Sequence, residues 1–411
     1  MRIAVTLLVF CVAALLALGM VMLYSSSTAD VGARYLVLQL AWCALGLGLC
    51  LAAVTFDYGR LRQGAWPLLA FTLLLLALVL IPSPFTTKVH GARRWFKIAG
   101  TAFEPSELAK GALIIALAWY GEHFQRQMPN WRRGIAVPAL FIGAVLALVF
   151  IEPDRGTTIL LASVSGVMLL IAGVRWRYIL PPVVLGIAGL AFSLWHDPMR
   201  IKRIFGWLHL EETKSGVGYQ AYQAMLALGA GGWTGLGLGN GRQKLGFVPE
   251  RHTDFIFAII GEELGLVATL SVVLAFLVII ACGIYIALNS RDTFGLLLAS
   301  GITFLIGLQA CINIGVVTSA LPNKGLPLPF ISYGGSNLLA MLTCVGLLLS
   351  IARHARTGGP LAPRSSQAED LPPPRSRRNP FQKPPPMPVS SARQNPGFGR
   401  TIAPRETFGS L

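Results

Sequence analysis

The amino-acid sequence predicts an all-α polytopic membrane protein with about ten transmembrane helices and a large loop between spans seven and eight. Of the 411 residues, 54% are apolar and only 13% are charged, whereas a soluble domain carries roughly 25% charged residues. Apolar stretches of about 20 residues, the length that crosses a bilayer as a helix, recur throughout residues 1–355. We therefore treat 1–355 as one membrane domain.

The expected spans are joined by short connections, except at three longer loops. The first span, at 4–24, has the length of a spanning helix and lacks the small-residue cleavage site of a signal peptide, so we expect it to be retained in the protein. The expected limits are 4–24, 35–56, 66–82, 105–121, 134–151, 157–174, 178–195, 255–286, 294–318 and 337–353.

Basic residues in alternate connections predict the orientation. The connections after the second, fourth, sixth and eighth spans contain them, and the segment after the last span is also basic. The positive-inside rule therefore makes these connections and both termini cytoplasmic. The residues concerned are Arg60, Arg62, Arg126, Arg132, Arg133, Arg175, Arg177 and Arg291.

The opposite face carries three substantial loops, at about 83–104, 196–254 and 319–336. The first two are basic, and the first contains Arg93 and Arg94. Cation clusters on the translocated face run against the positive-inside rule. Their presence there favours an anionic ligand such as phosphate or pyrophosphate. The alternative is that these side chains anchor to lipid headgroups by snorkelling.

The composition changes in residues 356–411, which are rich in proline and arginine. Such a segment buries too little apolar area to offset its ordering entropy, so we expect a disordered or polyproline-like cytoplasmic tail. Attraction to the anionic inner leaflet and docking of cytoplasmic partners are equally open interpretations.

Four motifs occur in order along the chain. They are HGARRW at 90–95 with EPSELAK at 104–110, EPDRGT at 152–157, the stretch 218–265, and LPNKGLPLPFISYGGS at 321–336. Together they resemble the SEDS family of bacterial cell-wall polymerases, over essentially all of 1–355. The resemblance implies a ten-helix SEDS fold and a peptidoglycan glycosyltransferase that polymerises lipid II, a disaccharide-peptide on undecaprenyl pyrophosphate. Apolar helix faces beside cationic loops suit such a substrate.

Asp254 precedes the apolar run that begins at Phe255, at the mouth of the eighth span. An ionisable group at a membrane helix is expensive, which argues for a functional role. The residue matches the aspartate to which the family's catalysis is attributed, so the resemblance implies a general base for the acceptor hydroxyl. Its position also suits a helix N-cap.

Substrate-binding candidates lie around Asp254 and in the other motifs. Lys244 and Arg251 are candidate phosphate contacts, and Glu250 and His252 stand where the family has a glutamate and a histidine. His252 is equally suited to an interfacial hydrogen bond.

Glu107 and Lys110 share one helical face, as a structural ion pair or as part of a polar cavity. The block 325–336 is either a bent loop that caps the bundle or a wall of the substrate cavity. It offers the hydroxyls of Ser332 and Ser336, and Lys324 beside it is a further candidate anion contact.

Cofactor and partner expectations follow from the same resemblance. No cluster has zinc-ligand spacing, and a divalent cation, Mg²⁺ or Mn²⁺, held by one carboxylate and substrate phosphate leaves no clear pattern. We expect no organic cofactor and no nucleic acid. The expected partners are lipid II, a class B penicillin-binding transpeptidase, other division proteins and the membrane.

Segments 238–240 and 323–329 are more similar to the family's division members than to its elongation members, which favours the cytoplasmic membrane at the septum. A lipid II flippase and a non-catalytic scaffold are the competing classes. A flippase should need polar groups deep in the bundle, whereas the notable charges lie near the outer ends of the spans.

Overall fold

The computed structural model describes residues 1–27, 34–84, 86–89, 92–98, 101–196, 198–243 and 252–355. The chain divides into two units, Met1–Leu361 and Ala362–Leu411. The predicted tail at 356–411 lies outside the described residues.

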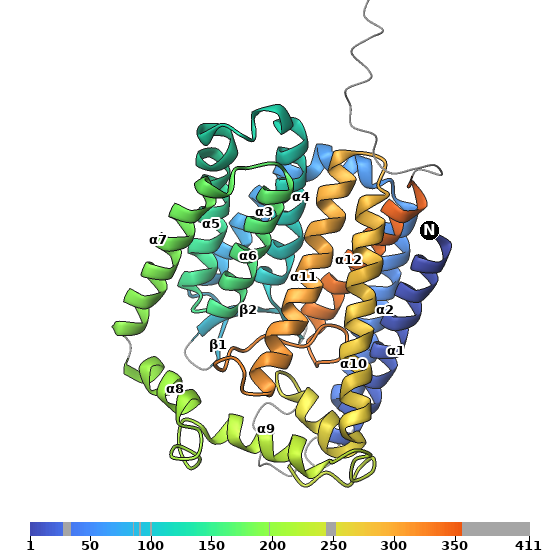
Figure 1. Cartoon of the computed structure of the whole chain (residues 1–411), viewed down its shortest axis with the longest axis vertical. Helices are drawn as coiled ribbons and strands as arrows, with labels where there is room; N and C mark the ends of the chain where they lie inside the picture. Colours follow the sequence, from blue (N-terminus) through green and yellow to red (C-terminus); the bar gives the residue numbers. More distant parts are fainter. Residues whose placement is uncertain are drawn as a thin grey trace, which may run out of the picture. The chain divides into compact units, whose positions relative to one another are not determined.

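Each of the ten predicted spans corresponds to a helix. These helices pack side by side, except α7, which lies at the edge of the bundle (Figure 1). Within the described ranges, eight helices are long and apolar enough to cross a membrane. The other two are α6, with 17 residues, and α4, which contains Glu107, Lys110 and Glu122. The ten helices are α1 Arg2–Ser27, α2 Arg34–Thr55, α3 Leu61–Leu80, α4 Pro105–His123, α5 Val137–Ile151, α6 Arg155–Ile171, α7 Trp176–Trp195, α10 Ile256–Leu288, α11 Thr293–Val317 and α12 Gly335–Arg353.

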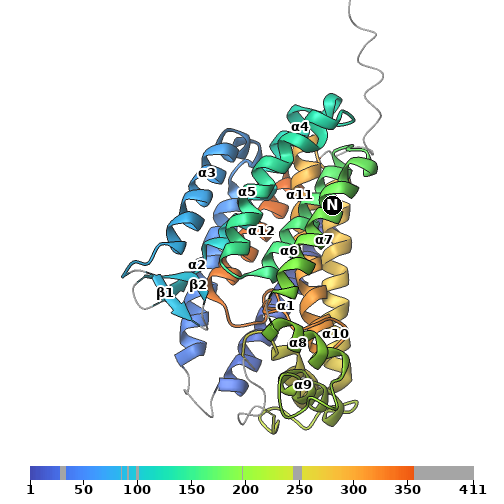
Figure 2. The ribbon, with the colours of Figure 1, turned by 90° about the vertical axis from the view of Figure 1, so that its left-hand side faces the viewer.

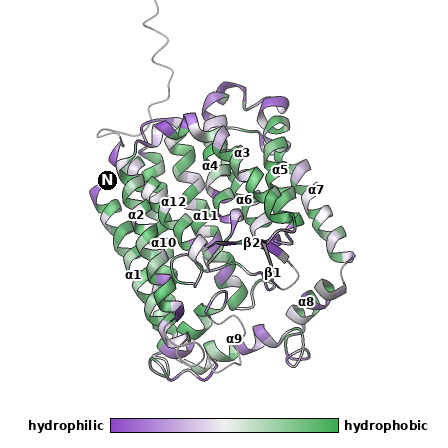
Figure 3. Cartoon of the chain, turned by 180° about the vertical axis from the view of Figure 1, so that it is seen from behind, coloured by the Kyte–Doolittle hydropathy of each residue, from purple (hydrophilic) through white to green (hydrophobic). Residues whose placement is uncertain are grey.

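The centre of the bundle is formed by α4, α11 and α12, which contact one another. Around them, α3 and α6 pack on α4, α10 packs on α11, and α2 packs on α12. Apolar residues cover the middle of the helices, and polar residues gather near the helix ends (Figure 3). Short helical turns at Tyr58–Arg60, Gln125–Gln127 and Arg132–Ala136 lie in the connections.

One end of the bundle carries the sheet, the segment between α7 and α10, and the connection from α11 to α12 (Figures 1 and 2). We call it the long-loop end. The segment between α7 and α10 was predicted as a loop, and its described residues include the helices α8 Pro198–Leu208 and α9 Tyr219–Ala230.

The long-loop end also contains a small antiparallel sheet, which the all-α prediction missed. Its strands are β1 Thr86–Val89, β2 Ala92–Ile98 and β3 Thr101–Phe103, in the order β1-β2-β3. Thr86 pairs with Phe96, and Lys97 pairs with Ala102. Threonine, valine and aromatic residues favour such pairing, but two of the strands have only three or four residues, too few to reveal an alternating pattern.

The eighth span is interrupted, which corrects the prediction of a single helix over 255–286. Gly265 inside α10 has φ 76° and ψ −172°, a conformation open to glycine. The backbone groups freed at this break are paired with the loop after α9. Leu236 N–H and Gly237 N–H donate to the carbonyls of Glu262 and Glu263, and Leu266 N–H donates to Gly232 O. The piece 256–264 is therefore a separate short helix, and the long membrane helix begins after Gly265.

Candidate active site

Hydrogen bonds to three consecutive backbone carbonyls fix the chain at the predicted catalytic aspartate. Tyr333 N–H donates to His252 O at 2.9 Å, and the Ser332 hydroxyl donates to Thr253 O at 2.6 Å. Asn313 on α11 donates from Nδ2 to Asp254 O at 2.8 Å. Segments about 60 and 80 residues further along the chain therefore hold 252–254 in one place, as the hydrogen bonds show. The block 325–336 lies directly against the segment that carries Asp254.

The Asp254 side chain is half-buried and lies beside Gly325. A Cβ atom at Gly325 would stand 3.0 Å from Asp254 Oδ2, so the glycine allows this close approach. The N-cap position of α10 is Phe255, and no side chain caps the helix there. The N-cap interpretation of Asp254 is therefore wrong, because the residue lies one position before the cap.

Two amides of α11 hold the loop that faces Asp254. Asn313 Nδ2 also donates to Leu326 O at 2.7 Å, and Gln309 Nε2 donates to Pro327 O at 2.9 Å. Gln309 and Asn313 are four residues apart and therefore lie on one face of the helix. Gln309 was not singled out from the sequence. A polar residue repeated at i and i+4 inside an apolar span was the signal available.

Glu107 and Lys110 form a buried ion pair that joins three helices. Lys110 Nζ donates to both carboxylate oxygens of Glu107 at 2.9 Å and to Gln309 Oε1 at 3.0 Å. Asn337 on α12 donates to Glu107 Oε2 at 2.9 Å. Lys110 is 1% exposed, so its charge is stabilised by these contacts rather than by water. A chain of hydrogen bonds runs from this pair through Gln309 to the loop beside Asp254.

The ion pair also borders an apolar pocket of about 380 Å³ between α2, α3, α4 and α12. Leucine, alanine and phenylalanine side chains form most of its wall, and Ser336 lies at the wall too. The two interpretations of Glu107 and Lys110 are therefore both present in the structure: a structural ion pair and a polar edge of a cavity.

Ser332 and His252 have structural partners. The Ser332 hydroxyl accepts from Leu328 N–H at 2.8 Å and donates its proton to Thr253 O. It positions the loop and has no proton left for a ligand. The His252 ring stacks on Tyr35 with centroids 4.9 Å apart and meets Tyr333 edge-on at 6.0 Å. Lys324 is half-buried, directly before Gly325.

Arg94 holds the turn between α5 and α6 and is separate from the contacts around Asp254. Its guanidinium donates to Glu152 O at 2.7 Å and to Pro153 O at 2.6 Å, and it lies 3.8 Å from the Asp154 carboxylate. Asp154 in turn caps α6 by accepting from Thr157 N–H. These contacts assign Arg94 a structural role at the long-loop end.

Glu152, in the same turn, is fully buried. Neither of its carboxylate oxygens accepts a hydrogen bond from the described part of the chain. Burial, together with the nearby carboxylates of Glu104 and Asp154, raises the pKa of Glu152 to about 9. Burial likewise raises the pKa of Glu104 to about 8. At neutral pH, Glu152 is therefore held in its uncharged form.

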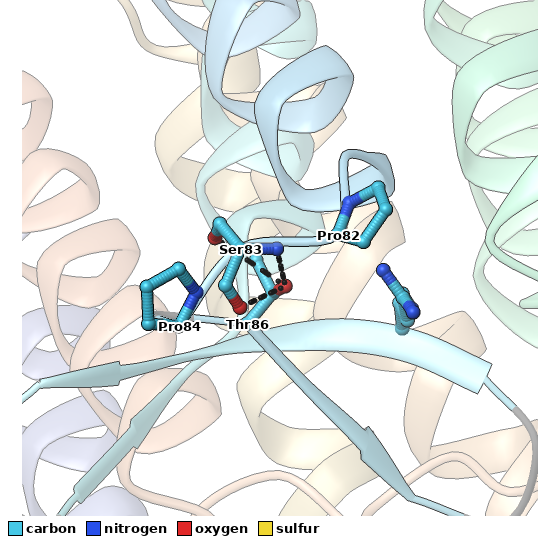
Figure 4. A pocket seen from close by; sticks show the side chains of 5 residues that line it. Pro82, Ser83, Pro84 and Thr86 are labelled. Carbon is cyan, nitrogen blue, oxygen red and sulfur yellow. Dashed lines mark hydrogen bonds between the residues drawn. The ribbon is translucent and has the colours of Figure 1, made fainter.

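Arg93 lies in a different place from Arg94. It borders a cavity of about 320 Å³ at the end of α3, with Pro82, Ser83, Pro84 and Thr86 (Figure 4). The Thr86 hydroxyl donates to Ile81 O at 3.2 Å and accepts from Ser83 N–H at 3.1 Å, which closes the turn beneath the cavity.

Glu262 and Glu263 are buried carboxylates that sequence reasoning missed. Glu262 Oε1 accepts from Arg242 N–H at 2.6 Å and Gln243 N–H at 3.1 Å, and Glu263 Oε2 accepts from Gly239 N–H at 3.1 Å. Glu263 also accepts from the Ser25 hydroxyl on α1. The two residues hold the glycine-rich loop 231–243 against the short helix 256–264. Two adjacent glutamates in an apolar run were the signal for such a role.

Three predicted ligands, Lys244, Glu250 and Arg251, lie outside the described residues. Among the residues that the structure does describe, no group of three histidine, cysteine, aspartate or glutamate side chains could hold a metal ion.

These features define a polytopic helical membrane protein with a carboxylate fixed at one end of its bundle, next to a buried ion pair and an apolar pocket. The chain matches the family of FtsW, RodA and SpoVE, described as cell cycle proteins, over residues 5–357, and it belongs to this family.

Similar proteins include the probable peptidoglycan glycosyltransferase FtsW of Geobacter metallireducens, 40% identical over 84% of this chain and 93% of that protein. The stage V sporulation protein E of Bacillus subtilis is 37% identical over 85% of this chain and 97% of its own.

Two solved structures share the fold. One comes from a peptidoglycan synthase complex that coordinates polymerization and crosslinking, with a TM-score of 0.72 and 31% identity over 84% of this chain and 96% of that one. The other is the rod shape determining protein RodA of Thermus thermophilus, with a TM-score of 0.63 and 30% identity over 85% of this chain and 97% of that one. The resemblance noted from the four motifs is thereby confirmed.

Proposed function

We propose that this protein is a peptidoglycan glycosyltransferase that polymerises lipid II, with Asp254 as general base. The observation that carries the proposal is the fixation of 252–254 by three hydrogen bonds, which place a half-buried carboxylate at one defined position. A base held in this way needs no reorganisation when the reaction occurs. The similarity to proteins named as probable peptidoglycan glycosyltransferases supports the substrate class.

The reaction is a single displacement at the anomeric carbon of the donor sugar. The acceptor hydroxyl oxygen forms the new bond to that carbon while the bond to the pyrophosphate oxygen breaks, and the hydroxyl proton moves to the Asp254 carboxylate. The leaving group is undecaprenyl pyrophosphate. One displacement inverts an α-linked donor to a β-linked product, so one catalytic carboxylate is sufficient.

The charge that develops on the pyrophosphate needs cationic stabilisation. Lys324, beside Gly325, and the basic residues Lys244 and Arg251 are the proposed contacts. A divalent cation, Mg²⁺ or Mn²⁺, would be held by Asp254 together with substrate phosphate oxygens, because the described residues offer no larger ligand set. The apolar pocket bordered by Glu107 and Lys110 suits part of the polyprenyl chain.

The proposed location is the cytoplasmic membrane at the division septum, with both termini in the cytoplasm and the long-loop end outside. Arginines in the connections at the opposite end support this orientation. The proposed partner is a class B penicillin-binding transpeptidase, together with other division proteins. It is supported by the similarity to a chain from a complex that coordinates polymerization with crosslinking.

The test uses purified full-length protein with a transpeptidase partner, supplied with labelled lipid II, as wild type and as Asp254→Ala. Wild type should form glycan polymer, and Asp254→Ala of equal thermal stability should not. Polymer from the variant would contradict the general-base assignment. Transport of lipid II across vesicles without polymer formation, under all cation conditions, would identify a flippase; neither activity would identify a scaffold.

A further inference from the structure

The helix α8 has two chemically different faces. Ile201, Phe205 and Leu208 follow helical spacing along one face, and they are 36%, 58% and 61% exposed. Lys202, about 100° round the helix from Ile201, is exposed beside this face, and Arg203 is exposed on the opposite side. The sequence of Pro198–Leu208 contains three basic residues and no acidic one. An exposed apolar stripe on a helix whose charged residues are all cations is typical of a helix that lies in a membrane interface.

The opposite face of α8 is attached to the protein. Gly206 is buried, and a Cβ atom there would stand 3.2 Å from Gly218 N. Trp207 donates from Nε1 to Ser319 O at 2.8 Å, at the beginning of the connection from α11 to α12. One face of the helix is therefore fixed, so the apolar stripe faces away from the attachment in a defined direction.

The exposed stripe continues the lipid-facing surface of α7. None of the 20 residues of α7, all of them described, is buried, and Trp195 at its end is 80% exposed. Only His196 and residue 197 separate α7 from α8, and Figure 1 shows α8 turning away from the end of α7 beneath the bundle. Because α7 is a membrane span, α8 begins at the membrane surface.

We propose that α8 is an interfacial helix that docks on the anionic lipid surface at the long-loop end. Ile201, Phe205 and Leu208 enter the boundary between headgroups and acyl chains, about 5–10 Å deep. Lys202 binds the lipid phosphates from the flanking side of the helix. Through Trp207, this docking also fixes the height of the 319–334 connection above the membrane. The proposal does not depend on the reaction that the protein catalyses.

Nanodiscs with lipids brominated on their acyl chains test this proposal. A fluorescent probe is attached to a single cysteine at position 205 or 202, in an otherwise cysteine-free full-length protein. The variants are Phe205→Cys and, as the matched control on the flanking side, Lys202→Cys. We expect acyl-chain quenching at 205 to exceed that at 202 by about twofold or more, since the two positions differ in depth. Quenching by iodide dissolved in the buffer should instead be stronger at position 202 than at position 205.

A second measurement uses the unlabelled protein. Amide hydrogen exchange across Pro198–Leu208 should be slower in nanodiscs with anionic lipid than in purely zwitterionic ones, and Lys202→Glu should abolish this difference. Equal quenching at 202 and 205 would overturn the proposal. So would an apolar face that stays accessible to iodide in nanodiscs and becomes shielded only when a partner protein is added.

Discussion

At the scale of single residues, the structure assigns much of the site to positioning. Hydrogen bonds to backbone carbonyls of the segments that surround Asp254 are donated by the side chains of Ser332, Asn313 and Gln309. Asp254 differs because its backbone is fixed while its carboxylate stays half-buried beside a glycine. This division of roles is what a general base requires, because catalysis falls steeply when a reacting group is displaced.

Gly325→Ala tests the space around the carboxylate. The new Cβ atom would stand 3.0 Å from Asp254 Oδ2, so the carboxylate must move by a few tenths of an ångström. We expect the polymerisation rate to fall by about tenfold or more, with little change in the thermal unfolding midpoint.

The matched control for Gly325→Ala is Gly229→Ala in α9, also at the long-loop end, where a Cβ atom meets nothing within 4 Å. This control should keep full activity. An unchanged rate in Gly325→Ala would show that the position of the Asp254 carboxylate is not critical.

Glu152→Gln tests the buried carboxyl group in the turn between α5 and α6. Its pKa is raised from 4.5 to about 9, so the folded protein keeps a proton that the unfolded chain releases. The contribution of the Glu152 carboxyl group to the free energy of unfolding is therefore at its full value below about pH 4.5, and it is lost as the pH rises toward 9. Glutamine has the same shape and never ionises.

We expect Glu152→Gln and wild type to unfold at similar temperatures at pH 5, and the variant to unfold at increasingly higher temperatures than wild type up to pH 9. Thermal unfolding in detergent across this range measures the difference. A constant difference at all pH values would contradict the raised pKa.

At the scale of elements, α10 shows how a break in a helix positions the site. The short helix 256–264 is buried, and the loop 231–243 pairs both with its backbone and with the carboxylates of Glu262 and Glu263. Asp254 lies at the beginning of this short helix, so the break at Gly265 and the loop together determine where the carboxylate stands.

Gly265→Ala should destabilise the protein. The position has φ 76°, and a Cβ atom would stand 2.4 Å from Gly235 N, a backbone atom that has no flexible side chain to yield. Strain of this kind costs about 1–3 kcal/mol before the clash is counted. We expect a lower unfolding midpoint in detergent and loss of polymerisation.

The control is again Gly229→Ala, which places a good helix former in an open position and should leave the unfolding midpoint equal or slightly higher. If Gly265→Ala unfolded like wild type, the break in α10 would not depend on glycine.

Long apolar stretches located all ten bundle helices, because length and hydropathy are properties of one segment. The break at Gly265 was not predicted, because it depends on a loop that supplies backbone partners from 26 to 34 residues earlier, as the hydrogen bonds show. The sheet was missed for another reason, since β1 and β3 are too short to reveal an alternating pattern.

Some site residues were likewise identified from the sequence, and others were not. Asp254 and the 325–336 block were identified through the motifs, and the structure brings the two together. The partners of Arg94, Glu262 and Glu263 were not foreseen, because a sequence does not show which backbone groups a buried side chain will meet. Lys244, Glu250 and Arg251 remain predictions.

At the scale of the whole molecule, one end of the membrane bundle gathers the features that the proposed reaction needs. A buried ion pair joins α4 to α11 and α12, and hydrogen bonds connect it to the loop at Asp254. An apolar pocket runs from this pair toward the opposite end of the bundle, at Phe56 and Leu61. A polar headgroup on a long apolar chain suits such a site, since one part of the ligand stays in the membrane while the other reaches the loops.

The most direct test of this account is the initial rate of lipid II polymerisation by Asp254→Asn in proteoliposomes. Asparagine keeps the shape of the side chain and accepts no proton, so a general base should lose about 100-fold or more in rate. The unfolding midpoint should stay equal to that of wild type. A stable Asp254→Asn protein that polymerises lipid II within about threefold of the wild-type rate, far less than the loss of a general base causes, would contradict the central claim.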